Sequence, residues 1–135
     1  MGPVTFIDTS AIVAILLGED EARALTTRAE SAGPCLTSSA VRLETCMVLA
    51  SRRDVSPLRA QDYFDGLASQ LGLSEAPIDE RVGRLAVECF ERYGKGRHPA
   101  QLNFGDCLSY ACAKAHDAAL LFEGEDFAQT DVTAR

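Results

Sequence analysis

The stretch Val4-Thr5-Phe6-Ile7-Asp8-Thr9-Ser10 decides how this chain folds. Its first four residues are β-branched or aromatic and form a short run suited to a buried strand. The run stops at Asp8-Thr9-Ser10, where side-chain oxygens can cap a helix that begins near Ala11. A buried strand that leads directly into a capped helix is typical of α/β proteins with a parallel sheet.

The same alternation of strand and helix patterns continues along the chain. Capping and breaking residues mark the boundaries, which are Gly33-Pro34, Ser38 or Ser39, Pro57 and Asp79. The further helices are expected over about 19–32, 38–53, 57–71, 79–93 and 105–116, and the further strands over about 35–37, 73–78 and 118–122. The sequence therefore predicts an α/β fold, a three-layer α/β/α sandwich with a small central parallel sheet, in a single domain over residues 1–135.

Composition excludes several classes of protein. Apolar residues at 47% and charged residues at 24% are ordinary globular proportions, which argues against disorder. The longest apolar run, Ala11 to Leu17, is too short to span a bilayer, and Met1-Gly2-Pro3 does not begin a targeting segment, so we expect a cytoplasmic protein without a membrane partner. Five cysteines without a C-x-x-C pair favour buried thiols over disulfides or a zinc site.

Two acidic residues stand out in the first half of the chain. Asp8 follows the first strand, where ligand sites of open α/β sheets collect, although it could also be a plain helix cap. Glu44 lies three or four residues from Ala40, Val41, Met47 and Val48, and hence on the apolar stripe of its helix, whereas Arg42, Thr45 and Arg52 supply the polar face. An ionised carboxylate on such a stripe is costly unless it is paired or binds a metal, or unless its head group reaches water.

Two further acidic positions occur in the second half. Asp106 opens a helix, where an acid can simply complement the helix dipole, but the neighbouring Gly105 permits close approach of another group. The segment 123–127 follows the last strand and is rich in acids, which would also suit a solvated loop. If the four positions converge at one edge of a parallel sheet, their oxygen ligands suit Mg²⁺ or Mn²⁺.

Four segments, in this order, resemble the motifs of VapC-type PIN domains. They are Phe6-Ile7-Asp8-Thr9-Ser10-Ala11, Ser39-Ala40-Val41-Arg42-Leu43-Glu44, Leu102-Asn103-Phe104-Gly105-Asp106-Cys107 and Leu120-Leu121-Phe122-Glu123-Gly124-Glu125-Asp126-Phe127. The resemblance covers essentially the whole chain and implies a ribonuclease fold, a divalent-metal site and the role of the toxin in a toxin–antitoxin pair. Its partners would be RNA, a VapB-type antitoxin and a second copy of the chain.

The resemblance also implies the residues of the site. Asp8, Glu44 and Asp106 would be catalytic metal ligands, and Thr9 or Ser10 would orient a ligand or water. Many PIN domains carry Thr-x-Asp after the last strand, a step that this sequence lacks. Asp126 is our choice for the fourth acid, with Glu123 and Glu125 as alternatives.

Such a site would activate water against an RNA phosphodiester and leave a 5′-phosphate and a 3′-hydroxyl. The net charge of −7 argues against general affinity for nucleic acid, so basic residues would have to line the approach to a neutralised acidic pocket. The candidates are Arg42, Arg52, Arg53, Lys95, Arg97 and His98. The apolar segment 11–17 is a candidate surface for another protein chain, with burial in the core as the alternative.

Two other functions compete with the nuclease. A receiver-like phospho-acceptor domain would need an adjacent pair of acids near the first strand and a Lys after a late strand, but Thr9 follows Asp8 and the late Lys114 falls inside a helix. A PIN-like domain could also act without catalysis, as a partner for an antitoxin or an assembly. The presence of all the expected acids argues against that second function.

Overall fold

The computed structural model describes residues 3–135. Met1 and Gly2, which entered the expectation about a targeting segment, lie outside the described residues. Four parallel strands of three residues each form the central sheet in the order β3-β2-β1-β4. They are β1 (Thr5–Ile7), β2 (Cys35–Thr37), β3 (Leu73–Glu75) and β4 (Ala119–Leu121). The predicted small parallel sheet is confirmed.

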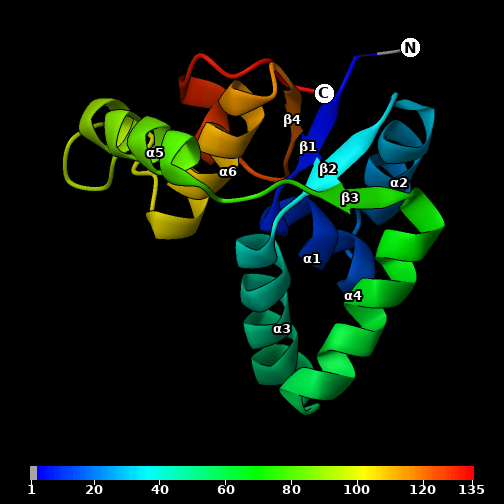
Figure 1. Cartoon of the computed structure of the whole chain (residues 1–135). Coiled ribbons are helices and arrows are strands. Elements are labelled where there is room, and N and C mark those ends of the chain that lie inside the picture. The colour runs from blue at the N-terminus through cyan, green and yellow to red at the C-terminus, as the bar shows by residue number, and fades with distance from the viewer. Residues whose placement is uncertain (1–2) are drawn as a thin grey trace.

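Helices cover both faces of this sheet. They are α1 (Thr9–Leu17), α2 (Ala22–Ser31), α3 (Ser39–Arg53), α4 (Pro57–Leu71), α5 (Glu80–Tyr93) and α6 (Phe104–Ala115), followed by the short 3-10 helix η1 (Asp126–Gln129). In Figure 1, α5 and α6 lie on one side of the sheet, and α1, α2 and α4 lie on the other. The predicted three-layer α/β/α architecture is therefore confirmed.

Side-chain caps explain where most helices begin. Asp8, Ser38, Ser56, Asp79 and Asn103 each accept a hydrogen bond from a backbone N–H in the first turn of the helix that follows. These polar residues interrupt apolar patterns in the sequence, which is why the starts of α3, α4 and α5 agree with the prediction to within one or two residues.

Three predicted boundaries need correction. Helix α1 begins at Thr9 rather than near Ala11, because Asp8 alone provides the cap. Helix α2 is shorter than predicted, since Gly18 ends α1 in a left-handed conformation and the chain must turn before α2 can start. Strand β3 stops at Glu75 rather than residue 78, and Pro77, which has no N–H to donate, prevents the ladder from continuing.

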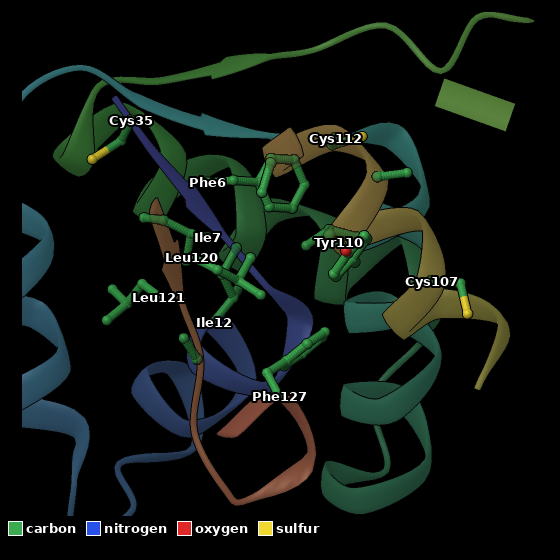
Figure 2. Packing of buried hydrophobic residues seen from close by; sticks show 14 of the residues in the cluster. Phe6, Ile7, Ile12, Cys35, Cys107, Tyr110, Cys112, Leu120, Leu121 and Phe127 are labelled. Atoms are coloured by element: carbon green, nitrogen blue, oxygen red, sulfur yellow. The ribbon is translucent and has the colours of Figure 1, made fainter. Parts of the chain in front are cut away.

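The core forms where alternating strand residues meet the two helix layers. Phe6 and Leu120 pair in register across β1 and β4, and Figure 2 shows both turned toward Tyr110 and Cys112 of α6, whereas Leu121 points to the opposite side. The five cysteines are all free and buried, as predicted. The alternation thus gives both faces of these two strands an apolar contact.

The apolar segment 11–17 is largely covered by its own chain. Ala11, Ile12, Ala14 and Leu17 are buried in α1, and Leu16 is only half-buried. Core burial, rather than contact with another protein chain, therefore explains most of this segment. Within residues 3–135, no helix is long and apolar enough to cross a membrane.

Truncation of a core side chain should show how strongly the sheet depends on this packing. Leu120 is fully buried, so Leu120→Ala should lower the free energy of unfolding by about 2–5 kcal/mol, through lost apolar burial and the cavity that remains. The matched control is Leu58→Ala, because Leu58 is 75% exposed and its loss should change that energy by no more than about 0.5 kcal/mol. Urea unfolding of both variants measures the difference, and equal losses would contradict the assigned core.

Candidate active site

Asp8 lies at the carboxyl end of β1, at the edge of the sheet where β4 also ends. Its backbone N–H donates to the carbonyl of Leu121, and its side chain is 2% exposed. Oδ2 accepts a hydrogen bond of 2.9 Å from the Ser10 N–H, whereas the buried Oδ1 has no hydrogen-bond partner among the described residues. Asp8 is therefore a helix cap whose second oxygen is buried and unsatisfied.

Glu44 approaches the same edge from α3. The Thr9 hydroxyl donates a hydrogen bond of 2.6 Å to Oε1 of Glu44 and so fastens the carboxylate to the start of α1. Gly105 of α6 faces the same group, because a Cβ added at Gly105 would lie 2.6 Å from Oε2 of Glu44. Three helices meet around this carboxylate, and glycine at position 105 gives it room.

The face of α3 that carries Glu44 differs from the predicted one. The buried side chains of α3 are Val41, Thr45, Cys46 and Leu49, whereas Met47 is 62% exposed. Thr45 was wrongly assigned to the polar face, and Met47 was wrongly assigned to the apolar stripe. Glu44 is half-buried at the edge of the buried face, which lets its carboxylate reach Thr9.

Asp106 occupies the first turn of α6. Its Oδ2 accepts from the Asn103 N–H, and the Asn103 side chain accepts from the Asp106 N–H, which together form a capping box. The pKa of the Asp106 carboxyl is raised to about 7, chiefly by burial and further by the negative charges of Asp8, Asp126 and Glu44, against a lowering effect of the Asn103 N–H. The electrostatic influence of all three acids on one carboxyl indicates that the four carboxylates share one region.

The segment after β4 is attached to this region through Ser10. The Ser10 hydroxyl accepts a hydrogen bond of 3.0 Å from the Glu123 N–H, and η1 then begins at Asp126. Asp126 is exposed, but Phe127 beside it is buried and anchors the turn. The charge of Asp126 is among those that raise the pKa of Asp106, but the choice of Asp126 over Glu123 and Glu125 as the fourth acid stays a prediction.

The carboxylate oxygens of the four acids are the type of ligand that a divalent cation prefers, although the structure does not arrange them as a coordination shell. Across residues 3–135, no group of three or more His, Cys, Asp or Glu side chains is arranged so that it could hold a metal ion. Thr9 and Asn103 instead hold the Glu44 and Asp106 carboxylates in hydrogen bonds. The unsatisfied Oδ1 of Asp8 and the mutual repulsion at Asp106 are the two features that a hard cation would relieve.

Comparison with known proteins shows the family of this chain. The family model of the PIN domain matches residues 5–132. This chain belongs to the PIN-domain family. It is 43% identical over 127 residues to the ribonuclease VapC28 of Mycobacterium tuberculosis, covering 93% of each chain, and 43% identical over 128 residues to the ribonuclease VapC of Mycolicibacterium smegmatis, covering 95% of this chain and 97% of that one.

Solved structures share the fold of this PIN domain. VapC20 of Mycobacterium tuberculosis, a toxin that cleaves the sarcin-ricin loop, superimposes with a TM-score of 0.76 at 19% identity, covering 97% of this chain and 98% of that one. VapBC2 of Rickettsia felis, bound to a DNA fragment from its promoter, gives a TM-score of 0.66 at 20% identity, covering 97% and 96%. The receiver-like alternative is therefore wrong.

The basic residues of this PIN domain that were candidates for binding RNA make contacts within the chain. Arg42 forms ion pairs of 2.6 Å with Asp65 and with Glu75, and these partners also raise its pKa. Arg97 donates to the Glu91 carbonyl, and Nδ1 of His98 accepts from the Ala100 N–H.

None of these contacts reaches the four acids. Arg52 also pairs, at 3.5 Å with Glu19, and Arg53 donates to the Leu17 carbonyl, while Lys95 is exposed in the loop after α5. The roles proposed for Arg42, Arg97 and His98 in binding RNA therefore gain no support from these contacts. Thr9 and Ser10, by contrast, hold the site together through Glu44 and Glu123.

Sequence reasoning did not identify Asn103 as a capping residue or Glu44 as the group that Gly105 faces. The Asn103-x-x-Asp106 spacing is a capping-box pattern and could have revealed the first. The contact between Gly105 and Glu44 depends on how α3 packs against α6, and no local sequence pattern specifies that packing.

The raised pKa of Asp106 predicts how the metal-free protein responds to pH. Because the folded-state pKa lies above the unfolded value of about 3.9, protonation of Asp106 stabilises the fold at low pH, and this contribution is lost as pH rises toward and through about 7. Asp106→Asn keeps an oxygen for the Asn103 N–H but carries no charge, so the variant should become more stable relative to wild type as pH increases.

Thermal melts with a chelator at about pH 5 to 8, which spans this interval, measure the difference. The matched control is Asp62→Asn, which changes an exposed carboxylate of α4. A constant difference in melting temperature between Asp106→Asn and wild type across that range would contradict the assigned repulsion.

Proposed function

We propose that this PIN-domain protein is a metal-dependent endoribonuclease of the VapC type, the toxin of a toxin–antitoxin pair that inhibits translation and growth until its antitoxin neutralises it. The observation that carries the proposal is the convergence of Asp8, Glu44 and Asp106 from three different elements, with a buried oxygen of Asp8 left unsatisfied. The similarity to proteins named VapC ribonucleases supports the choice of RNA as substrate.

The residues of the chain have distinct tasks in this proposal. Asp8, Glu44, Asp106 and Asp126 would hold Mg²⁺ or Mn²⁺, which supplies a water of lowered pKa and offsets the charge of the scissile phosphate. Thr9 positions Glu44 by its 2.6 Å hydrogen bond, and Ser10 ties the acidic segment after β4 to the start of α1. Asn103 orients Asp106 through the capping box.

The partners follow from the same relationship. Similar solved structures include a toxin–antitoxin complex from Klebsiella pneumoniae and DNA-bound VapBC from Salmonella typhimurium, so we expect a VapB-type antitoxin to bind this chain. A homodimer is the expected state of the toxin itself. RNA substrate and antitoxin would both be met in the cytoplasm.

Removal of one acidic charge should abolish cleavage while the fold remains. Asp8→Asn retains a side-chain oxygen that can accept from the Ser10 N–H, and Asp106→Asn retains one for the Asn103 N–H, so both helix caps survive. Each variant should lose RNA cleavage by at least ~100-fold, as is common when one group that stabilises transition-state charge is removed.

A labelled structured RNA incubated with Mg²⁺ or Mn²⁺ measures this loss, with Asp62→Asn as the control that should cleave like wild type. Wild-type rates of RNA cleavage in Asp8→Asn and Asp106→Asn would contradict the assignment of these residues to the active site. A wild-type protein that binds an antitoxin but cleaves no RNA with either metal would favour the non-catalytic alternative.

Metal binding should also stabilise the folded chain, independently of cleavage. A cation that binds only the assembled carboxylates stabilises the fold by about 2.7 kcal/mol when its concentration is 100 times its dissociation constant. Melts of wild type, Asp106→Asn and Asp62→Asn with chelator, Mg²⁺ or Mn²⁺ at about pH 8, above the raised carboxyl pKa, measure the effect. The metal-induced shift should be large in wild type and Asp62→Asn and small in Asp106→Asn, so equal shifts in all three would count against a shared site.

A further inference from the structure

The segment that follows β4 is fastened to α6 at Asp131. The Tyr110 hydroxyl donates a hydrogen bond of 2.6 Å to Oδ1 of Asp131, and the Lys114 ammonium donates to Oδ2 at 3.2 Å and to the Asp131 carbonyl at 3.4 Å. Arg92 of α5 adds a longer ion pair of 3.7 Å with Oδ2. In Figure 1 this part of the chain, drawn in red, lies beside α6. Asp131 therefore ties the segment to the helix that carries Asp106.

The hydrogen bond from Tyr110 is the strongest of these contacts. Tyr110 is only 5% exposed, so its hydroxyl is largely shielded from water and needs a partner within the protein. The ion pairs of Asp131 with Lys114 and Arg92 join side chains that are 37–56% exposed, and ion pairs in contact with water contribute little. An oxygen acceptor at position 131 should therefore matter more than the negative charge there.

Local hydrogen bonds connect Asp131 with Asp126 without a gap. Asp126 begins η1, and Thr130 follows its end. The Thr130 N–H and hydroxyl both donate to the Phe127 carbonyl, at 3.1 and 2.7 Å, and the same hydroxyl accepts from the Val132 N–H at 3.3 Å. Movement at Asp131 is thus transmitted to η1 through short, hydrogen-bonded steps.

Three contacts hold the acidic segment, one at its start, one in its middle and one at its end. Ser10 accepts from the Glu123 N–H at the start, and the buried Phe127 packs into the core in the middle. Asp131 provides the contact at the end. Asp126 itself is exposed, so its position depends on how these three contacts fix the backbone.

We infer that Asp131 is a positioning residue, which accepts the hydrogen bond of Tyr110 and thereby fixes η1 against α6 so that Asp126 can join Asp106 at the cation. Groups that orient metal ligands from behind commonly change metal affinity by about 10–100-fold. The inference deepens the proposed function and rests on it, in particular on Asp126 as the fourth acid.

Three variants separate the contact of Asp131 from its charge. Asp131→Ala removes both, whereas Asp131→Asn removes the charge but keeps an oxygen that can accept from Tyr110. Tyr110→Phe removes only the hydroxyl and keeps the ring in the core. Asp62→Ala, at an exposed carboxylate of α4, is the matched control for a lost negative charge.

Hydrogen exchange of the metal-free protein tests the positioning without any metal or RNA. In Asp131→Ala and Tyr110→Phe, the Thr130 N–H should exchange about 10-fold faster than in wild type, the effect expected when one hydrogen bond that closes a local structure is lost. The N–H groups of β1 should keep their wild-type rates. Asp131→Asn and Asp62→Ala should match wild type at both places.

Titration with Mn²⁺ at about pH 8, above the raised pKa of Asp106, tests the consequence for the site. Calorimetry should give a dissociation constant about 10-fold weaker for Asp131→Ala and Tyr110→Phe, and a value close to wild type for Asp131→Asn and Asp62→Ala. Asp126→Asn should also weaken Mn²⁺ binding, because it removes a proposed ligand.

The outcomes distinguish this inference from the proposed function. If Asp126→Asn weakens Mn²⁺ binding but Asp131→Ala and Tyr110→Phe do not, only the positioning role is overturned. If Asp126→Asn binds Mn²⁺ like wild type, Asp126 is not the fourth acid and the inference is overturned with that assignment. Asp131→Asn that binds as weakly as Asp131→Ala would make the charge decisive and overturn the inference, as would faster exchange throughout β1 in Asp131→Ala and Tyr110→Phe.

Discussion

Burial of the Asp8 carboxylate is the constraint on which the site depends. Asp8 directly follows β1, which lies inside the sheet between β2 and β4, so the carboxyl end of β1 is enclosed and the Asp8 carboxylate has little access to water. One oxygen is satisfied by the Ser10 N–H at the start of α1, but the other has no hydrogen-bond partner among the described residues. An unpaired buried charge is costly, and a bound cation is the means by which proteins commonly retain one.

The surrounding elements bring two further carboxylates close to the start of α1 and the first turn of α6. Helix α3 contributes Glu44, which Thr9 holds from α1, and α6 contributes Asp106, which its own capping box holds. Gly105 keeps the space into which the Glu44 carboxylate fits. Asp8, Glu44 and Asp106 thus each also make a structural hydrogen bond. The metal-free fold is destabilised at Asp106, where burial and three negative charges raise the pKa of the carboxyl.

The same first turn of α6 connects the acidic cluster with the apolar surface. Gly105 and Asp106 face the acidic site, while Phe104 and Cys107 line an apolar groove between α5 and α6, the α5–α6 groove. A helix presents different faces at neighbouring positions, so one turn can border the acidic cluster and an apolar surface together. Any change in this turn can therefore affect both faces.

The sequence by itself determined the alternation of strands and helices, the start of α3, α4 and α5, and the identity of Asp8, Glu44 and Asp106 as candidates. These features depend on local chemistry, because Asp8, Ser38 and Asp79 cap helices at the ends of apolar runs. Tertiary packing decided the rest. Whether Glu44 meets Thr9 and Gly105, whether Thr45 is buried and Met47 exposed, and whether the segment 11–17 belongs to the core all depend on how helices far apart in sequence cross one another. The α5–α6 groove likewise exists only when two helices lie side by side, since the apolar stripe of α5 alone does not say which of its residues a neighbour will cover.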